Sequence, residues 1–242
     1  MKIKYSLIFF ITLLFSSSLF AKETKILQKD MALKYIVKEP AIKNSTTPLI
    51  ILLHGYGSNE ADLFSLAKDL PQEAIVVAVR APIALRNGFA WIPVNRFGDK
   101  EDPAAPEASR KTLLQFIDQA ARKYHIPASR IYLMGFSQGA MMSLNIALTR
   151  PEKIKGIAML SGRLIEDTKS RLAPVTSINQ VSIFMAHGTE DQIIPIQEGR
   201  DAHNYMTSKN IKTEYHEYKI VHTISSEELM DVQKWFAVNL KK

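Results

Sequence analysis

The sequence contains no cysteine among its 242 residues. That absence excludes disulfide bonds, a thiolate nucleophile, a cysteine-based metal site and a lipid anchor on an N-terminal cysteine. Dense runs of basic residues are absent too. The formal net charge is +7, but the lysines and arginines are scattered along the chain, which is typical of a solvated surface and not of a nucleic-acid-binding site. We therefore expect no nucleic-acid partner.

The first 21 residues have the features of a secretory signal peptide. Lys2 and Lys4 give a positive start, the segment 7–15 (LIFFITLLF) is apolar, and cleavage is expected after Ala21. The apolar run is well short of the ~20 residues that a membrane-spanning helix needs. Leu19 is larger than is usual at its position before a cleavage site, so an uncleaved anchor stays open as an alternative. Either way, we expect the rest of the chain to be periplasmic or secreted, with no stable membrane span after cleavage and with the charge reduced from +7 to +5.

Residues 22–242 have the composition of one globular domain, because the chain is 46% hydrophobic and shows no repeat or linker. Strand patterns occur at 32–37, 49–53, 73–80, 130–134, 155–160, 181–186 and 213–220. Helical patterns occur at 60–69, 105–124, 140–148, 196–208 and 225–240, the last with a capping box at Ser225 and Glu228. Strands that alternate with helices predict an α/β fold with a mostly parallel central sheet and helices on both faces.

The segment 134–140 (MGFSQGA) lies between a predicted strand and a predicted helix. Gly-x-Ser-x-Gly in that context indicates a nucleophile elbow, a sharp turn that exposes the serine hydroxyl at the carboxyl end of the strand. Gly135 and Gly139 are explained by crowding, because a Cβ at either position would hold helix and strand apart. The alternative is a turn with glycines for geometry alone. Ser137 is the predicted nucleophile.

A serine nucleophile needs a histidine base, which a carboxylate orients. With an elbow of this kind the chain order is serine, acid, histidine. That order excludes three histidines as the base: His54, His125 and His187. His203 lies within a predicted helix and His216 within a predicted strand. His222 follows that strand just before the closing helix, where a loop residue can reach the serine, and it is the predicted base.

The predicted acid follows the strand at 181–186, in the segment 187–191 (HGTED). Asp191 is the first candidate and Glu190 the second, and the alternative is an aspartate that only shapes the turn. The oxyanion of the reaction needs two backbone donors. We predict the amides of Gln138, at the start of the elbow helix, and of Tyr56, in the glycine-containing loop after the strand at 49–53. His54 is expected to anchor that loop by a hydrogen bond.

With these residues in place, the chain resembles the phospholipase/carboxylesterase family of serine hydrolases, which includes acyl-protein thioesterases. The resemblance runs from about residue 48 to the C-terminus. It rests on segments 53–57 (LHGYG), 135–139 (GFSQG) and 187–191 with Pro195, and on His222 with Ile224 and Glu227. It implies an α/β-hydrolase fold, ester or thioester hydrolysis without metal or cofactor, and the roles given above for Ser137, Asp191, His222, Tyr56 and Gln138.

Two further expectations concern details of the site. The family usually has glycine before the catalytic histidine, whereas this chain has Val221. A β-branched residue does not readily adopt φ > 0, so we expect a different loop and a slightly displaced His222 ring. Trp91 and Phe89 are candidates to line the substrate pocket, with plain core packing as the alternative.

The sequence thus predicts a periplasmic or secreted serine carboxylesterase that acts on small-molecule or lipid-like esters, thioesters included, of short to medium acyl chains. Two alternatives stay open: an esterase or depolymerase acting on polymers or polysaccharides, and a non-catalytic binding protein on the same fold. The oligomeric state is not predicted.

Overall fold

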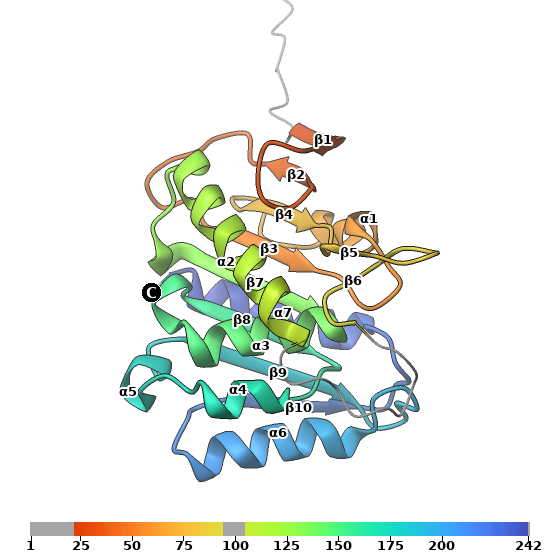
Figure 1. Cartoon of the computed structure of the whole chain (residues 1–242). Helices are drawn as coiled ribbons and strands as arrows, with labels where there is room; N and C mark the ends of the chain where they lie inside the picture. The colour runs from red at the N-terminus through yellow and green to blue at the C-terminus, as the bar shows by residue number, and fades with distance from the viewer. Residues whose placement is uncertain (1–21, 94–104, 242) are drawn as a thin grey trace, which may run out of the picture.

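A computed structural model describes residues 22–93 and 105–241 (Figure 1). The predicted signal peptide, residues 1–21, lies outside the described residues. The main sheet has eight strands in the order β1-β2-β4-β3-β7-β8-β9-β10. They are β1 Lys22–Gln28, β2 Tyr35–Glu39, β4 Ile75–Val79, β3 Leu49–Leu53, β7 Ile131–Phe136, β8 Gly156–Leu160, β9 Ser182–Gly188 and β10 Glu214–Tyr218. The pairs β1-β2 and β2-β4 are antiparallel and all others are parallel, as the alternating pattern predicts.

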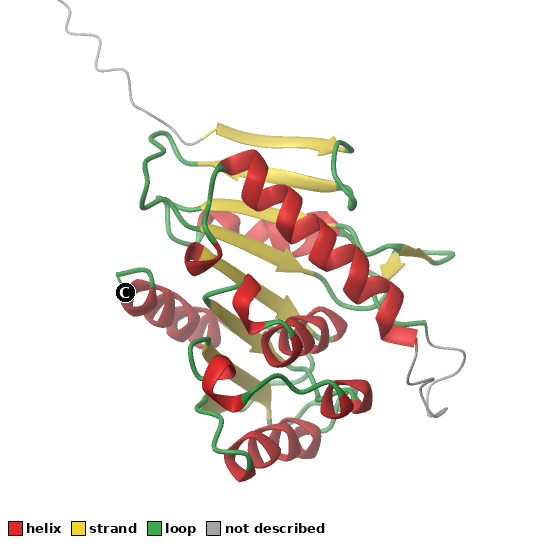
Figure 2. Cartoon of the chain, turned by 60° about the vertical axis from the view of Figure 1, so that its left-hand side comes forward, coloured by secondary structure: helices red, strands yellow, loops and turns green. Residues whose placement is uncertain are grey.

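Helices cover both faces of this sheet (Figures 1 and 2). They are α1 Glu60–Phe64, α2 Ala105–Tyr124, α3 Gln138–Thr149, α4 Glu166–Ser170, α5 Val175–Ile178, α6 Ile196–Ser208 and α7 Ser226–Asn239, with short 3-10 helices η1 Ser65–Lys68, η2 Ala128–Arg130 and η3 Pro151–Lys153. Side chains of α2, α3 and α6 pack on one face, and side chains of α1 and α7 pack on the other. The fold class predicted from the sequence is confirmed.

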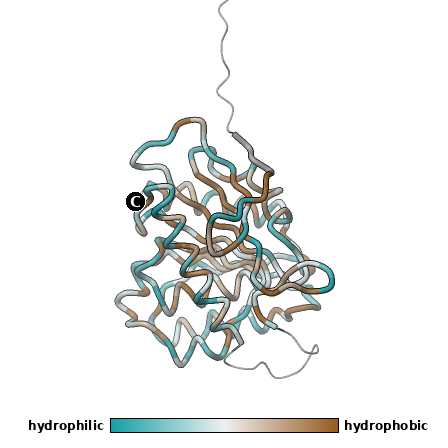
Figure 3. Tube along the Cα trace, turned by 45° about the horizontal axis from the view of Figure 1, so that its top comes forward, coloured by the Kyte–Doolittle hydropathy of each residue, from teal (hydrophilic) through white to brown (hydrophobic). Residues whose placement is uncertain are grey.

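The two cores follow from the two-residue period of a strand. Strand β3 is completely buried, and its alternate residues belong to opposite cores: Leu49 and Ile51 to the α2–α3 side, Ile50 and Leu52 to the α1–α7 side. A strand buried on both faces must be apolar throughout, which is why residues 49–53 read LIILL. Figure 3 shows the apolar segments, in brown, gathered toward the middle of the molecule.

The helix boundaries agree with the sequence patterns where capping residues mark them. Helix α7 begins with the predicted capping box, in which Ser225 Oγ accepts from the Glu228 amide and the Glu228 carboxylate accepts from the Ser225 amide. The predicted helix at 60–69 is instead α1 followed by η1. Sequence patterns missed β1, the short hairpin of β5 Ile83–Ala84 and β6 Phe89–Ala90, and the small helices α4 and α5.

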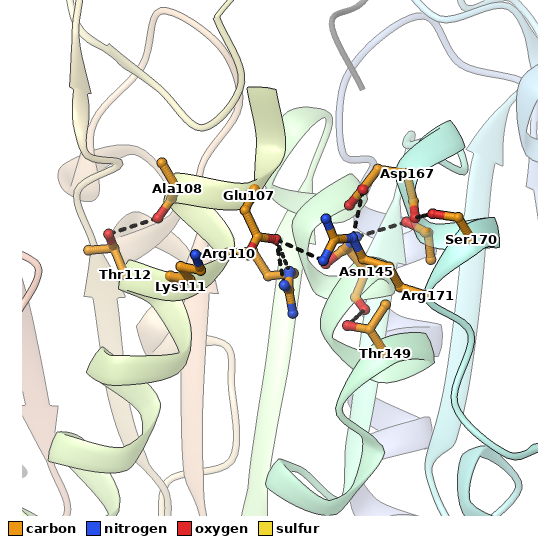
Figure 4. A network of polar contacts seen from close by, with 11 residues as sticks. Glu107, Ala108, Arg110, Lys111, Thr112, Asn145, Thr149, Asp167, Ser170 and Arg171 are labelled. Atoms are coloured by element: carbon orange, nitrogen blue, oxygen red, sulfur yellow. Dashed lines mark hydrogen bonds and ion pairs between the residues drawn. The ribbon is translucent and has the colours of Figure 1, made fainter. Parts of the chain in front are cut away.

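A polar network joins the helices α2, α3 and α4 on one face of the sheet (Figure 4). Glu107 on α2 accepts from Arg110 and pairs with Arg171, which follows α4 and also donates to Asp167 at 2.7 Å. Asn145 on α3 donates to a threonine of α4 at 2.8 Å. These bonds hold α4 against the helix that follows the predicted elbow, so they stabilise the scaffold rather than the reacting groups.

Candidate active site

Ser137 stands at the turn between β7 and α3, at the carboxyl edge of the sheet. Its backbone has φ 56° and ψ −120°, a conformation that L-residues rarely adopt and that costs on the order of 1–3 kcal/mol. A Cβ on Gly135 would overlap the Gly139 backbone, and a Cβ on Gly139 would overlap the Leu53 carbonyl. The crowding expected from the sequence is therefore real, and the glycines let helix α3 approach β7 and β3 closely.

Three side chains that are distant in sequence meet at this turn. His222 Nε2 lies 3.0 Å from Ser137 Oγ, and His222 Nδ1 lies 2.6 Å from Asp191 Oδ2. Both distances are those of hydrogen bonds. The His222 ring also packs at 4.7 Å from the ring of Phe136, which precedes the serine. The structure thus brings together the predicted nucleophile, base and acid, with the base between the other two.

Asp191 is held in place by the backbone that follows it. Its Oδ1 accepts from the amides of Ile193 and Ile194, each at 2.9 Å, which leaves Oδ2 directed at His222. The side chain is completely buried. His187, which the chain order excludes as a base, bonds the Ile194 carbonyl at 2.8 Å and therefore supports the same loop. Glu190, the second candidate acid, is exposed.

The loop that carries His222 does not need a glycine before the histidine. Among the described residues other than glycine, only four have positive φ, and Val221 is not one of them. The expectation of a displaced ring is wrong, because the His222 ring is within hydrogen-bond distance of Ser137. The backbone of this loop packs closely instead against Gly188 on β9, where a Cβ would clash with the Ile220 carbonyl. The glycine that this loop requires is thus on the neighbouring strand.

The loop 54–58, which follows β3, passes directly beside the serine. A Cβ placed on Gly55 would lie 3.2 Å from Ser137 Cβ. Tyr56, whose amide is a predicted oxyanion donor, is next in this loop and is 40% exposed. Gln138 is the first residue of α3, so its amide has no acceptor within the helix. The two predicted donors therefore belong to segments that flank Ser137.

The side chain of Gln138 has a separate role that the sequence did not suggest. Its Oε1 accepts from the amides of Trp91 at 3.0 Å and Ile92 at 3.2 Å, and its Nε2 donates to the Ile92 carbonyl at 3.0 Å. The amide group of one buried side chain thus satisfies three backbone groups. This ties the start of α3 to the segment at 91–92.

His54 anchors the loop 54–58, as expected. Its Nε2 accepts from the Ala81 amide at 3.1 Å, so Nδ1 carries the proton and donates to the Gly55 carbonyl at 2.7 Å. Burial lowers the pKa of His54, which keeps this tautomer neutral. The Trp91 indole donates to the His54 carbonyl at 2.9 Å, and the indole is completely buried. The interpretation of Trp91 as a pocket residue is therefore corrected to core packing.

A second set of contacts fixes the same loop from outside. Gly57 donates to the Phe89 carbonyl at 2.9 Å, and Phe89 donates to the Ser58 carbonyl at 2.8 Å. Arg80 forms two bonds to Glu60, at 2.6 and 2.5 Å, and its guanidinium lies 4.5 Å from the centre of the Phe89 ring. Burial alone would raise the pKa of Glu60, but the bonds from Arg80 lower it. The Phe89 ring packs beneath Arg80 and against the core, which supports core packing over pocket lining.

Comparison with known proteins agrees with this geometry. Residues 35–240 match the family described as Phospholipase/Carboxylesterase. The chain belongs to that family. It is 29% identical to acyl-protein thioesterase 1 of Candida albicans over 221 residues, which cover 82% of this chain and 95% of the relative.

Two solved structures resemble the fold of this family member. The Bacillus cereus carboxylesterase superposes with a TM-score of 0.76 at 24% identity and covers 86% of this chain and 94% of its own. Esterase PE8 superposes with a TM-score of 0.72 at 26% identity and covers 85% of this chain and 98% of its own. Family and relatives together identify the enzyme as a serine hydrolase that acts on carboxylic ester bonds.

No helix within residues 22–93 and 105–241 is both long and apolar enough to cross a membrane. The same residues contain no group of three or more histidine, aspartate or glutamate side chains arranged to hold a metal ion.

Proposed function

We propose that Ser137, His222 and Asp191 are the catalytic triad of a carboxylesterase that hydrolyses small-molecule or lipid-like esters, thioesters included, of short to medium acyl chains. The observation that carries the proposal is the continuous hydrogen-bonded path from Asp191 Oδ2 through the His222 ring to Ser137 Oγ. Membership of the family and a relative named acyl-protein thioesterase 1 support an ester or thioester as the bond that is cleaved.

The first half-reaction forms an acyl-enzyme. Ser137 Oγ attacks the acyl carbonyl while His222 Nε2 accepts its proton. Asp191 stabilises the imidazolium through Nδ1, and the two amides bonded to its other oxygen keep it aimed at the ring. The amides of Tyr56 and Gln138 stabilise the oxyanion. His222 then gives the proton to the leaving alcohol or thiol.

The second half-reaction frees the serine. A water molecule takes the place of the leaving group, and His222 Nε2 accepts its proton as it attacks the acyl carbonyl. The carboxylic acid departs, and the proton returns to Ser137 Oγ. One base at one position serves both halves because the leaving group and the water approach the same side of the acyl group.

We further propose that the enzyme is periplasmic or secreted. The apolar segment 7–15 after two lysines, ahead of Ala21, supports export. Fractionation of the native host with N-terminal sequencing of the mature chain tests this point, and an N-terminus that retains residues 1–21 in the cytosolic fraction would contradict it.

The function is tested by comparing the mature chain with Ser137→Ala on nitrophenyl esters and thioesters of increasing acyl length. The wild type should hydrolyse them with the highest kcat/KM at short to medium length. The variant should retain its circular dichroism spectrum and lose turnover by about 10⁴-fold or more. A wild-type chain that hydrolyses no member of the panel would instead support a non-catalytic binding protein on this fold.

A further inference from the structure

A small cavity lies between the helix pair α1–η1 and the loop that carries His222. Its volume is about 180 Å³, and its lining includes Leu63, Leu66, Phe136, Ile224, Asp62 and His222. The lining is mixed: its apolar residues are the two leucines, Phe136 and Ile224, and the acidic Asp62 is exposed. Of the residues in its lining, only His222 takes part in the reaction steps described above.

The position of the cavity relates it to one part of the substrate. His222 is in its lining, and Phe136, also in its lining, precedes Ser137. On its other side Ser58, from the loop that holds a proposed oxyanion donor, donates to Asp62 at 2.6 Å. The cavity therefore lies between the proposed base and the helix pair that follows the loop 54–58. A leaving group must place its oxygen or sulfur within hydrogen-bond distance of His222 Nε2, so the group attached to that atom extends beside the ring.

The size of the cavity limits what it can hold. Pockets for drug-sized ligands have volumes of roughly 300–1,000 Å³. This cavity, at about 180 Å³, is smaller than that range. The cavity therefore suits a compact group of a few heavy atoms and not a long chain.

The charge at its rim decides which compact groups are favoured. Asp62 is the only acidic residue in the lining, and the lining contains no lysine or arginine among the described residues. The carboxylate attracts a cation a few ångströms away and repels an anion, and its exposure keeps the effect modest and sensitive to salt. Leu63, Leu66 and Phe136 provide the apolar contact that an alkylammonium head also needs.

We propose that this cavity is the leaving-group subsite of the enzyme and that Asp62 makes it select small alcohols with a cationic head over neutral and anionic alcohols of the same shape. The proposal rests on the function proposed above. It concerns the alcohol side of the ester alone and is independent of the acyl length that the enzyme prefers.

The test uses three butyrate esters with matched leaving groups, together with nitrophenyl butyrate. Butyrylcholine has a cationic head, 3,3-dimethylbutyl butyrate is its uncharged isostere, and 2-sulfoethyl butyrate is anionic. The value of kcat/KM is measured at low salt for the wild type, for Asp62→Asn and for Asp69→Asn. The Asp62→Asn variant keeps an oxygen that can accept from Ser58. Asp69 follows the same helix pair but is not in the lining, so it is a matched control.

The wild type should prefer butyrylcholine to its isostere, and the sulfonate should be the poorest substrate. Asp62→Asn should reduce the cationic-to-neutral ratio by about three- to tenfold and leave the value for the isostere nearly unchanged. Asp69→Asn should leave the ratio as in the wild type. Equal ratios in the wild type and Asp62→Asn, with the esters still hydrolysed, would overturn the subsite alone. Turnover of nitrophenyl butyrate without turnover of butyrylcholine would also overturn it. If the wild type hydrolyses none of the four esters, the proposed function is overturned as well.

Discussion

The two sides of the candidate site are held by different means. The loop 54–58 is fixed by contacts from distant segments: the Trp91 indole donates to the His54 carbonyl, and Phe89, whose ring lies beside Arg80, bonds the backbone of the loop. The loops that carry Asp191 and His222 are fixed by backbone bonds within each loop and between the two, such as that from the Glu190 amide to the Ile220 carbonyl. Amides at 193 and 194 hold the acid, and a capping box begins the helix directly after the base.

This difference has a physical reason. An oxyanion donor is a backbone amide, so only the whole loop can be positioned, and that takes several contacts from outside it. A base and an acid are side chains that position each other once their loops are near. We therefore expect substitutions on the His222 side to lower kcat by removing a group that takes part in the reaction. Substitutions on the 54–58 side should lower kcat by shifting the loop.

The largest effect is expected for Asp191→Asn. The amide oxygen can still accept from the 193 and 194 amides, but the NH₂ group cannot accept the proton that His222 carries on Nδ1, so the ring takes the wrong tautomer. The value of kcat for a short acyl ester should fall by about 10⁴-fold with the melting temperature little changed. A loss below tenfold would show that Asp191 does not orient the base.

A smaller loss is expected for Arg80→Ala, which removes both bonds to Glu60 and the contact with Phe89. Complete removal of an oxyanion donor costs on the order of 10²–10³ in rate, and a loosened loop should cost part of that. We expect kcat to fall by about tenfold or more with KM changed by less than about twofold.

The matched control for Arg80 is Arg200→Ala, because Arg200 also forms two bonds to a glutamate, at 2.8 and 2.7 Å, on the edge strand β10. If the two variants have the same kcat while both remain folded, the contacts of Arg80 stabilise the fold and do not position the oxyanion donor.

The His222 side should respond to pH through Glu228, the buried member of the capping box. Burial raises the pKa of Glu228 to about 7 from an ordinary value of 4.5. The folded state therefore favours the protonated carboxyl, so this contribution is complete below pH 4.5 and is lost as the pH rises to about 7. The difference is at most about 3 kcal/mol.

Urea unfolding at pH 5 and pH 8 measures that contribution. Glu228→Gln should reduce the pH dependence of the free energy of unfolding, whereas Glu227→Gln, at the exposed neighbouring position, should not. An identical pH dependence in the wild type and Glu228→Gln would mean that Glu228 is ionised at no cost to the fold.

The smallest effect is expected for Val221→Gly, which restores the residue that the family usually has before the histidine. Val221 is 53% exposed and has no left-handed backbone conformation. The substitution should change kcat by less than about threefold, since the His222 ring already reaches Ser137. A large gain in kcat would show that the valine displaces the ring during turnover.

These contrasts also explain what could be predicted from the sequence. The elbow, the acid and the base each follow a strand directly, and short-range rules of turns and caps determine their places. The partners of the loop 54–58, Trp91 and Phe89, are far from it in sequence, so these contacts could not be inferred, nor could the three bonds of the Gln138 side chain. The error at Val221 came from assuming that the position before the histidine requires a positive φ, which Val221 does not have.

The edge of the sheet was missed for a similar reason. Strand β1 has no continuous apolar run, because it pairs on one side only and lies next to β2 at the end of the sheet.

The sequence left the role of Trp91 open between pocket lining and core packing, because aromatic residues are used for both. Its placement depends on a bond to the His54 carbonyl that no local pattern encodes.

Covalent labelling shows directly whether His222 activates the hydroxyl of Ser137. The mature chain is treated with a fluorophosphonate that reacts with activated serines, and the adduct is located by peptide mass spectrometry. We predict one adduct, on Ser137, that is lost in Ser137→Ala and forms at least about a thousandfold more slowly in His222→Ala. An adduct on a different serine, or labelling of Ser137 at the same rate without His222, would contradict the account.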